Sequence, residues 1–166
     1  MAKVPYAVVW TDMFPTVHQA AQLEELVEST YYTYCWALDG LASGRWDITE
    51  ENFTEVYNGV MRKDWFDSRP NKLCPIVMMK YVHREACHNW LDNGKDPSRV
   101  PAQKAAHMHC FYMPASGHPI QEDHIYVSSV GLVRIAPCEL PGRMYVIIGH
   151  KLDGGHWKAE IRTAPG

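Results

Sequence analysis

The strongest secondary-structure signal in the chain is VHQAAQLEELVESTYYTYCWALDGL, residues 17–41. Its apolar residues recur every three or four positions, which is typical of one face of an amphipathic helix. Thr16 is a suitable N-cap, and Gly40 can supply a left-handed cap at the other end. We therefore predict a long helix with Asp39 near its C-terminal end. The apolar positions are Val17, Ala20, Ala21, Leu26, Val27, Tyr31, Tyr34, Cys35, Leu38 and Leu41.

Two shorter helices are predicted further along the chain. Thr49, followed by acidic residues, opens a helix that runs to about residue 59, because a hydroxyl cap and first-turn acids satisfy the free amides and the helix dipole. An apolar face over 76–91 predicts a third helix, which ends near an Asn-Gly pair at 93–94. The other segments expected here are a short strand at 64–67 and a loop at 95–104.

The last third of the chain favours strands, because β-branched and aromatic residues alternate with turn signals. Helices followed by antiparallel strands indicate an α+β fold, in which the helices pack on one face of a curved sheet that wraps a pocket. At 166 residues the chain fits one domain, 1–166, with 1–16 as an N-terminal extension. The expected strands are 106–113, 124–135, 143–150 and 156–163.

The composition indicates a folded protein with a small partner. Apolar residues make up 46% of the chain and charged residues 21%, as in ordinary globular proteins. A net charge of -3 argues against nucleic acid as the partner. The chain starts without a secretory signal, and no apolar run approaches about 18 residues. We therefore expect a cytoplasmic protein that does not bind membranes.

Two sequences, YCWALDGLASGRWD at 34–47 and LDGGHWKAEIRT at 152–163, carry a family resemblance together with the order of helices and strands. The chain resembles the SnoaL-like cone-fold superfamily, which shares its fold with nuclear transport factor two and includes scytalone dehydratase, polyketide cyclases and ketosteroid isomerase. The resemblance implies a cone-shaped α+β barrel, with three N-terminal helices on a strongly curved antiparallel sheet around an apolar pocket. It also implies a homodimer or higher homo-oligomer that needs no cofactor and no metal.

The nearest branch of this superfamily is that of the dehydratases, cyclases and isomerases, and it implies an acid–base site. The branch typically carries a Tyr five residues before an Asp, and this Asp orients a His on the first long strand. Tyr34, Asp39 and His107 match that pattern, with His109 as the alternate to His107. Arg162 is the nearest match to an arginine that bile-acid dehydratases carry on the last strand.

The chemistry of this pattern is proton transfer at carbon. A carboxylate bonded to one imidazole nitrogen fixes the tautomer, and the other nitrogen can then take a proton from an acidic carbon. Because side chains on a strand repeat every two residues, His107 and His109 are expected to share one face. Further imidazoles of the cavity or its rim are His124 and His150. Aromatic residues expected to line the substrate pocket are Trp36, Tyr126, Tyr145 and Trp65.

The predicted function is that of a cofactor-free lyase, cyclase or isomerase acting on a hydrophobic, ring-bearing small molecule, in secondary metabolism. A second reading is a non-catalytic ligand-binding or assembly subunit of the same fold, and a cyclase that works by cycloaddition or epoxide opening also stays open. A third reading places a metal on His107 and His109, as in cupins. The residues that follow, 111–114, lack the glutamate that this pattern requires.

Overall fold

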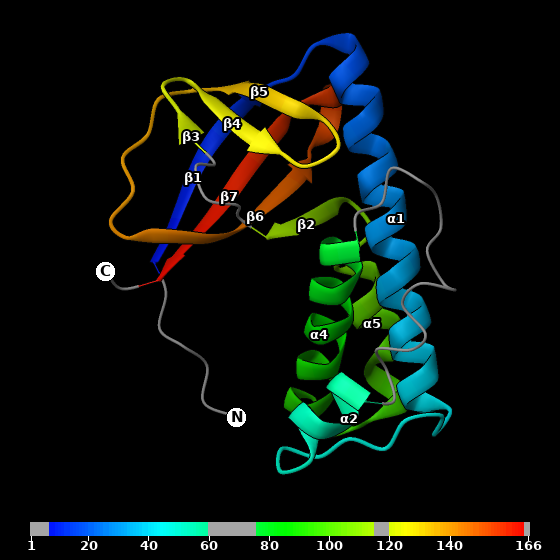
Figure 1. Ribbon diagram of the computed structural model, residues 1–166. Coiled ribbons are helices and arrows are strands. Elements are labelled where there is room, and N and C mark those ends of the chain that lie inside the picture. The colour runs from blue at the N-terminus through cyan, green and yellow to red at the C-terminus, as the bar shows by residue number, and fades with distance from the viewer. Residues whose placement is uncertain (1–6, 60–75, 115–119, 165–166) are drawn as a thin grey trace.

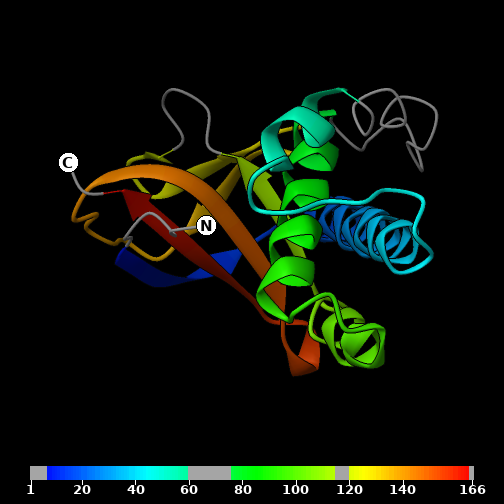
Figure 2. The same ribbon diagram turned by 90° about the horizontal axis from the view of Figure 1, so that it is seen from below.

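Helices pack against one strongly curved antiparallel sheet in this protein, which confirms the predicted α+β class (Figure 1). The computed structural model describes residues 7–59, 76–114 and 120–164. Seen from below, the helices gather at one side of the sheet (Figure 2). No helix within these ranges is long and apolar enough to cross a membrane. The helices are α1 (Val17–Ala42), α2 (Phe53–Gly59), α4 (Ile76–Asp92) and α5 (Val100–Ala105), with 3-10 turns η2 (Pro97–Arg99) and η3 (Asp153–Gly155).

Helix α1 confirms the prediction for 17–41 and extends it by one residue. Thr16 caps its N-terminus, because the hydroxyl accepts from the Gln19 amide at 3.1 Å while the Gln19 side chain accepts from the Thr16 amide. The expected cap at Gly40 is wrong, because the helix continues past this residue and Gly44 adopts the positive φ of 81°. Gly40 instead leaves room for the indole ring of Trp46.

The other helices agree with the sequence in part. Helix α4 matches the predicted 76–91, and it ends as expected, with Gly94 at φ 68° and a bond from the Lys95 amide to the Trp90 carbonyl. Helix α2 is shorter than predicted, since Thr49 and Asn52 form a hydrogen-bonded turn before it. The predicted loop at 95–104 is wrong, because it contains η2 and α5. The strand expected at 64–67 lies outside the described residues.

The sheet has seven strands in the order β2-β6-β7-β1-β5-β4-β3, and all its pairs are antiparallel. Sequence analysis assigned no strand to the N-terminal extension, yet β1 lies in the middle of this order. The strands are β1 (Ala7–Phe14), β2 (Cys110–Pro114), β3 (Ile120–Gln121), β4 (His124–Val127), β5 (Gly131–Ile135), β6 (Arg143–Lys151) and β7 (Trp157–Ala164).

The predicted strands at 143–150 and 156–163 are confirmed as β6 and β7, whereas the other two predicted strands differ from the structure. The range 124–135 is a hairpin rather than one strand, because Ser129 turns the chain at φ 71° between β4 and β5. The range 106–113 begins with a turn, and the strand starts only at Cys110. This later start removes His107 and His109 from the strand, so their expected placement on one strand face is wrong.

One hydrophobic core joins the helices to the sheet. Helices α1 and α4 pack on each other, and both contact β2. Leu23, Leu38, Met78, Phe111 and Ile161 are all fully buried in it. Across the ladders β1–β7, β7–β6 and β6–β2, paired residues share a face. We call one of these the polar face: it carries Trp10, Tyr112, His150, Glu160 and Arg162, among others.

Candidate functional site

Asp39 and His107, the pair expected to act together, do not contact each other. Asp39 lies in the last part of α1, where its carboxylate accepts from the Lys104 ammonium at 2.5 Å. Its side chain is 63% exposed. Five helical residues rotate the chain by about 140°, so Asp39 and Tyr34 lie on different sides of α1. Tyr34 therefore faces the interior while Asp39 faces the α5 surface.

His107 follows α5, in a turn that holds its imidazole by the backbone. Its Nδ1 lies 2.8 Å from the Gln103 carbonyl oxygen, and because a carbonyl only accepts, Nδ1 carries the proton. Burial lowers the pKa of His107, and the nearby Arg162 guanidinium lowers it further. At neutral pH the imidazole is thus neutral, with Nε2 as its basic nitrogen.

Tyr34 lies directly against His107. The two rings stack with centroids 3.9 Å apart and an interplanar angle of 19°. Tyr34 is fully buried, and its hydroxyl oxygen accepts from the Asn89 amide at 2.7 Å. Burial raises the pKa of Tyr34, so the phenol keeps its proton. Since the hydroxyl oxygen accepts here, its own O–H remains able to donate.

His109 does not join this group. Its side chain is exposed, and its backbone carbonyl accepts from the Lys151 amide. Within residues 7–59, 76–114 and 120–164, no three His, Cys, Asp or Glu side chains come together as metal ligands would. The metal reading of His107 and His109 therefore finds no ligand set in the described part of the chain.

Arg162 comes to the same region from the polar face of β7. Its Nε donates to Glu160 Oε2 at 2.8 Å, and its guanidinium lies near the Tyr81 hydroxyl of α4. Tyr81 in turn contacts the ring of Tyr112, at 5.7 Å between centroids. Tyr34, His107 and Arg162, which the family resemblance singled out, thus lie near one another at the junction of helices and sheet.

A carboxylate–imidazole pair that sequence reasoning did not assign lies on the same polar face. His150 Nε2 is 3.1 Å from Glu160 Oε1, and Glu160 is 9% exposed. The hydrogen bond with His150 lowers the pKa of Glu160, and the bond from Arg162 lowers it further. The β6–β7 hairpin is the signal that could have revealed this pair. Its register places His150 opposite Lys158, so Glu160, two residues further along β7, is the diagonal neighbour of His150 on the same face.

Of the four aromatic residues expected to bind substrate, the three that the structure describes are dispersed. Trp36 packs against Trp46 and His83, each at 5.2 Å between ring centroids. Tyr126 is 41% exposed on β4, three strands away from β7 in the sheet order. Tyr145 stands at a β-bulge of β6, near Tyr81: burial raises the pKa of Tyr81, and Tyr145 adds to that rise. Trp65 lies outside the described residues.

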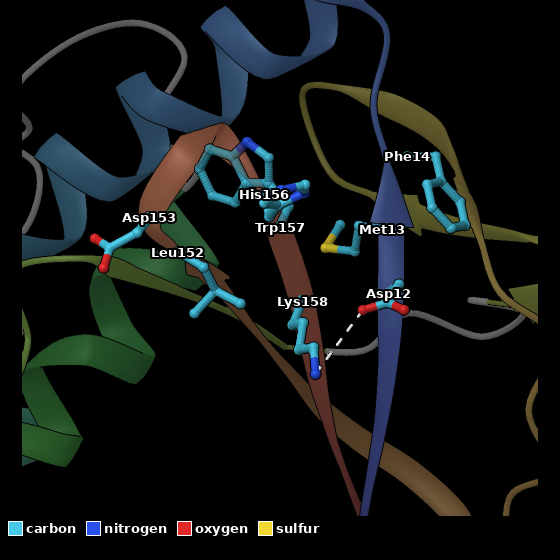
Figure 3. A pocket seen from close by; sticks show the side chains of 8 residues that line it. All are labelled: Asp12, Met13, Phe14, Leu152, Asp153, His156, Trp157 and Lys158. Atoms are coloured by element: carbon cyan, nitrogen blue, oxygen red, sulfur yellow. Dashed lines mark ion pairs between the residues drawn. The ribbon is translucent and has the colours of Figure 1, made fainter.

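A surface hollow of about 650 Å³ lies elsewhere, where β1 and β7 meet the β6–β7 turn (Figure 3). Figure 3 shows Met13 between the two strands, with Trp157 beside His156 and an ion pair between Asp12 and Lys158. This hollow contains none of the predicted catalytic residues. It differs in place from the apolar pocket expected around Asp39 and His107.

The sequence matches no model of a known protein family, and a search among curated proteins finds no significant match.

Proposed function

We propose that this protein is a cofactor-free lyase, isomerase or cyclase that transfers protons on a hydrophobic, ring-bearing small molecule. The proposal includes a cone-shaped SnoaL-like domain with three N-terminal helices and an enclosed apolar pocket, a homo-oligomer, and a cytoplasmic location. The observation that carries it is the Tyr34–His107 stack, with Nδ1 of His107 held by the Gln103 carbonyl. Such an imidazole is a neutral base with a fixed tautomer.

In the proposed reaction His107 begins the chemistry. Nε2 takes a proton from a carbon next to a carbonyl, and the electron pair of the broken C–H bond moves into the carbonyl to form an enolate. The guanidinium of Arg162 stabilises the charge on the enolate oxygen. In an isomerisation the imidazolium then gives the proton to another carbon of the conjugated enolate, and the carbonyl re-forms. In an elimination the enolate electron pair re-forms the carbonyl and makes a C=C bond as the C–O bond breaks, and the imidazolium protonates the departing hydroxyl, which leaves as water. The Tyr34 O–H is a second donor for that leaving group.

Asp39 has no part in this scheme. In the structure its carboxylate is bonded to Lys104, and the nitrogen of His107 that an orienting acid would hold is bonded to Gln103. The backbone carbonyl fixes the tautomer in the same way as a carboxylate does, but it adds no negative charge. Burial therefore still lowers the pKa of His107, although the hydrogen bond to the Gln103 carbonyl acts in the opposite direction.

Exchange of carbon-bound protons tests the proposal without knowledge of the natural substrate. The protein is incubated in D2O with 2-tetralone, a bicyclic ketone with acidic protons next to its carbonyl, and loss of the C1 proton signal is followed by NMR. Wild type should accelerate the exchange over buffer. His107→Gln should slow it by about 100-fold or more, as loss of a general base does. His109→Gln, two residues away and exposed, is the matched control and should retain the rate.

The pH profile of the exchange is a further readout. Burial lowers the pKa of His107, so the rate should fall only when the pH drops below the ordinary histidine value of about 6.5. Far-UV circular dichroism of both variants checks that they fold. A wild-type rate equal to that of buffer, or a His107→Gln rate equal to wild type, contradicts the proposal and favours a non-catalytic binding protein.

A further inference from the structure

A second group of side chains on the polar face combines a fixed imidazole with an exposed indole. Trp10 of β1 stands directly opposite Glu160 of β7, and His150 of β6 stands opposite Lys158. Residues paired in this way share a face of the sheet, and residues two apart on one strand do too. Trp10, His150 and Glu160 therefore all project from the same face.

The imidazole of His150 has a defined tautomer. Because the ionised Glu160 can only accept, the Nε2 that faces it at 3.1 Å carries the proton. Arg162 bonds the other carboxylate oxygen and keeps Glu160 charged. In the neutral imidazole Nδ1 of His150 is therefore the accepting nitrogen, and the structure gives it no hydrogen-bond partner among the described residues. The side chain of His150 is 28% exposed, so a ligand can reach it.

Trp10 supplies an apolar surface beside this acceptor. Its ring centroid lies 5.0 Å from that of His150, at an interplanar angle of 38°, and the residue is 53% exposed. An indole of which half lies in water can bury further apolar area when a flat ring covers it. The same strand face continues to Phe14, which is 51% exposed and stands opposite Arg134 of β5 rather than in the β1–β7 ladder.

We propose that Trp10, His150 and Glu160 form a binding site for a flat aromatic molecule that carries an N–H or O–H donor on its ring. The ring lies against Trp10, and the donor hydrogen bonds to Nδ1 of His150. Glu160 does not touch the ligand: it is a positioning residue that holds His150 in the tautomer that accepts. The site deepens the proposed function, on which it rests for the assumption that the ligand is a small ring-bearing molecule.

Two probes that differ in one donor test the site. Indole carries a ring N–H and 1-methylindole does not, and the dissociation constant of each is measured by NMR titration of the full-length protein. Indole should bind roughly threefold to tenfold more tightly, as one hydrogen bond implies. His150→Phe keeps an aromatic ring and should abolish that preference. Trp10→Ala should weaken both probes by roughly tenfold, whereas Phe14→Ala, the matched control, should change neither.

A nitrogen-15 spectrum of the histidine side chains gives an independent readout, in which neutral His150 should show a protonated Nε2 and a bare Nδ1. Glu160→Gln should change that spectrum and reduce the preference for indole. The proposal is overturned if neither probe binds, if both bind equally, if Trp10→Ala leaves binding unchanged, or if Nδ1 carries the proton. A failure of 2-tetralone exchange together with the expected indole binding overturns the proposed function alone, since His107 is not part of this site.

Discussion

At the scale of single residues, His83 is a histidine that the fold keeps neutral. It is fully buried in α4, stacked on Trp36 and edge-on to Trp46, with ring centroids 5.2 Å away in both cases. Burial lowers the pKa of His83 to about 3, and the nearby Arg45 guanidinium contributes in the same direction. In the unfolded chain the same group titrates near its ordinary value of about 6.5.

This difference in pKa predicts a loss of stability in acid. Because the unfolded state binds the proton first, the free energy of unfolding falls as the pH drops from about 6.5 towards 3, by up to about 1.4 kcal/mol per pH unit. His83→Phe keeps an aromatic ring and removes the titration. When the pH is lowered from 7 to 5, the free energy of unfolding of this variant, measured in urea, should therefore fall by about 2 kcal/mol less than that of wild type.

Exposed His18 of α1 provides the control for this experiment. His18→Gln should leave the pH dependence of unfolding as it is in wild type. Equal pH dependence in His83→Phe and wild type would show that His83 is not the group that makes the fold sensitive to acid.

How far single residues of the site could be predicted depends on how far apart they lie in sequence. Helical periodicity places Tyr34 inside and, by the same rotation, Asp39 outside, so the sequence itself argues against their joint use. His107 lies near Tyr34, but a backbone carbonyl rather than a carboxylate holds it, and residue types do not reveal such a bond. Glu160 and His150 meet only through the register of a hairpin, which side-chain identity alone does not specify.

At the scale of elements, Gly40 allows the segment that follows α1 to pack its Trp46 ring against the helix. A Cβ at this position would lie 2.1 Å from the ring of Trp46, which is 3% exposed. Glycine to alanine inside a helix ordinarily stabilises by about 0.5–1 kcal/mol. Gly40→Ala should have the opposite sign and destabilise by about 1–3 kcal/mol in urea unfolding, because the indole must shift.

A double-mutant cycle separates this clash from other effects. In Trp46→Leu the ring is gone, so adding Gly40→Ala to that background should no longer destabilise. An equal loss in both backgrounds would place the cause in the helix backbone rather than in the contact with Trp46.

Elements with a strong local signal were predictable, and those set by their neighbours were not. Helix α1 has its cap, its apolar face and 26 residues of periodic sequence, so its range follows from local rules. Helix α5 has six residues, one of them a proline at its start, and it is too short to show a period. Strand β2 begins later than the predicted 106, because residues 106–109 complete a turn before the chain pairs with β6.

At the scale of the whole molecule, the N-terminal strand completes the sheet. Strand β1 pairs with β7 over seven residues and with β5 over two. It therefore links β7, the last strand of the chain, to the hairpin of β4 and β5. Such pairing joins residues 120 or more positions apart, and the bond from the Thr11 hydroxyl to the Ala136 carbonyl at 2.6 Å spans 125 positions. The β-branched and aromatic residues of 7–14 favour a strand, but the strands with which it pairs lie far along the chain, so its central place in the sheet does not follow from local sequence.

The position of β1 predicts that the fold depends on it. Thr11, 6% exposed and opposite Ala159, lies inside the β1–β7 ladder, where proline would remove an amide donor and force its ring against the neighbouring strand. Thr11→Pro should therefore lower the free energy of unfolding by about 3 kcal/mol or more. Thr11→Ala removes only the hydroxyl bond and should lose about 1 kcal/mol. Val17→Pro, at the first position of α1, should be harmless, because the first helical residue needs no amide donor. If Thr11→Pro were as stable as Thr11→Ala in urea unfolding, β1 would be an accessory strand and the sheet would hold together without it.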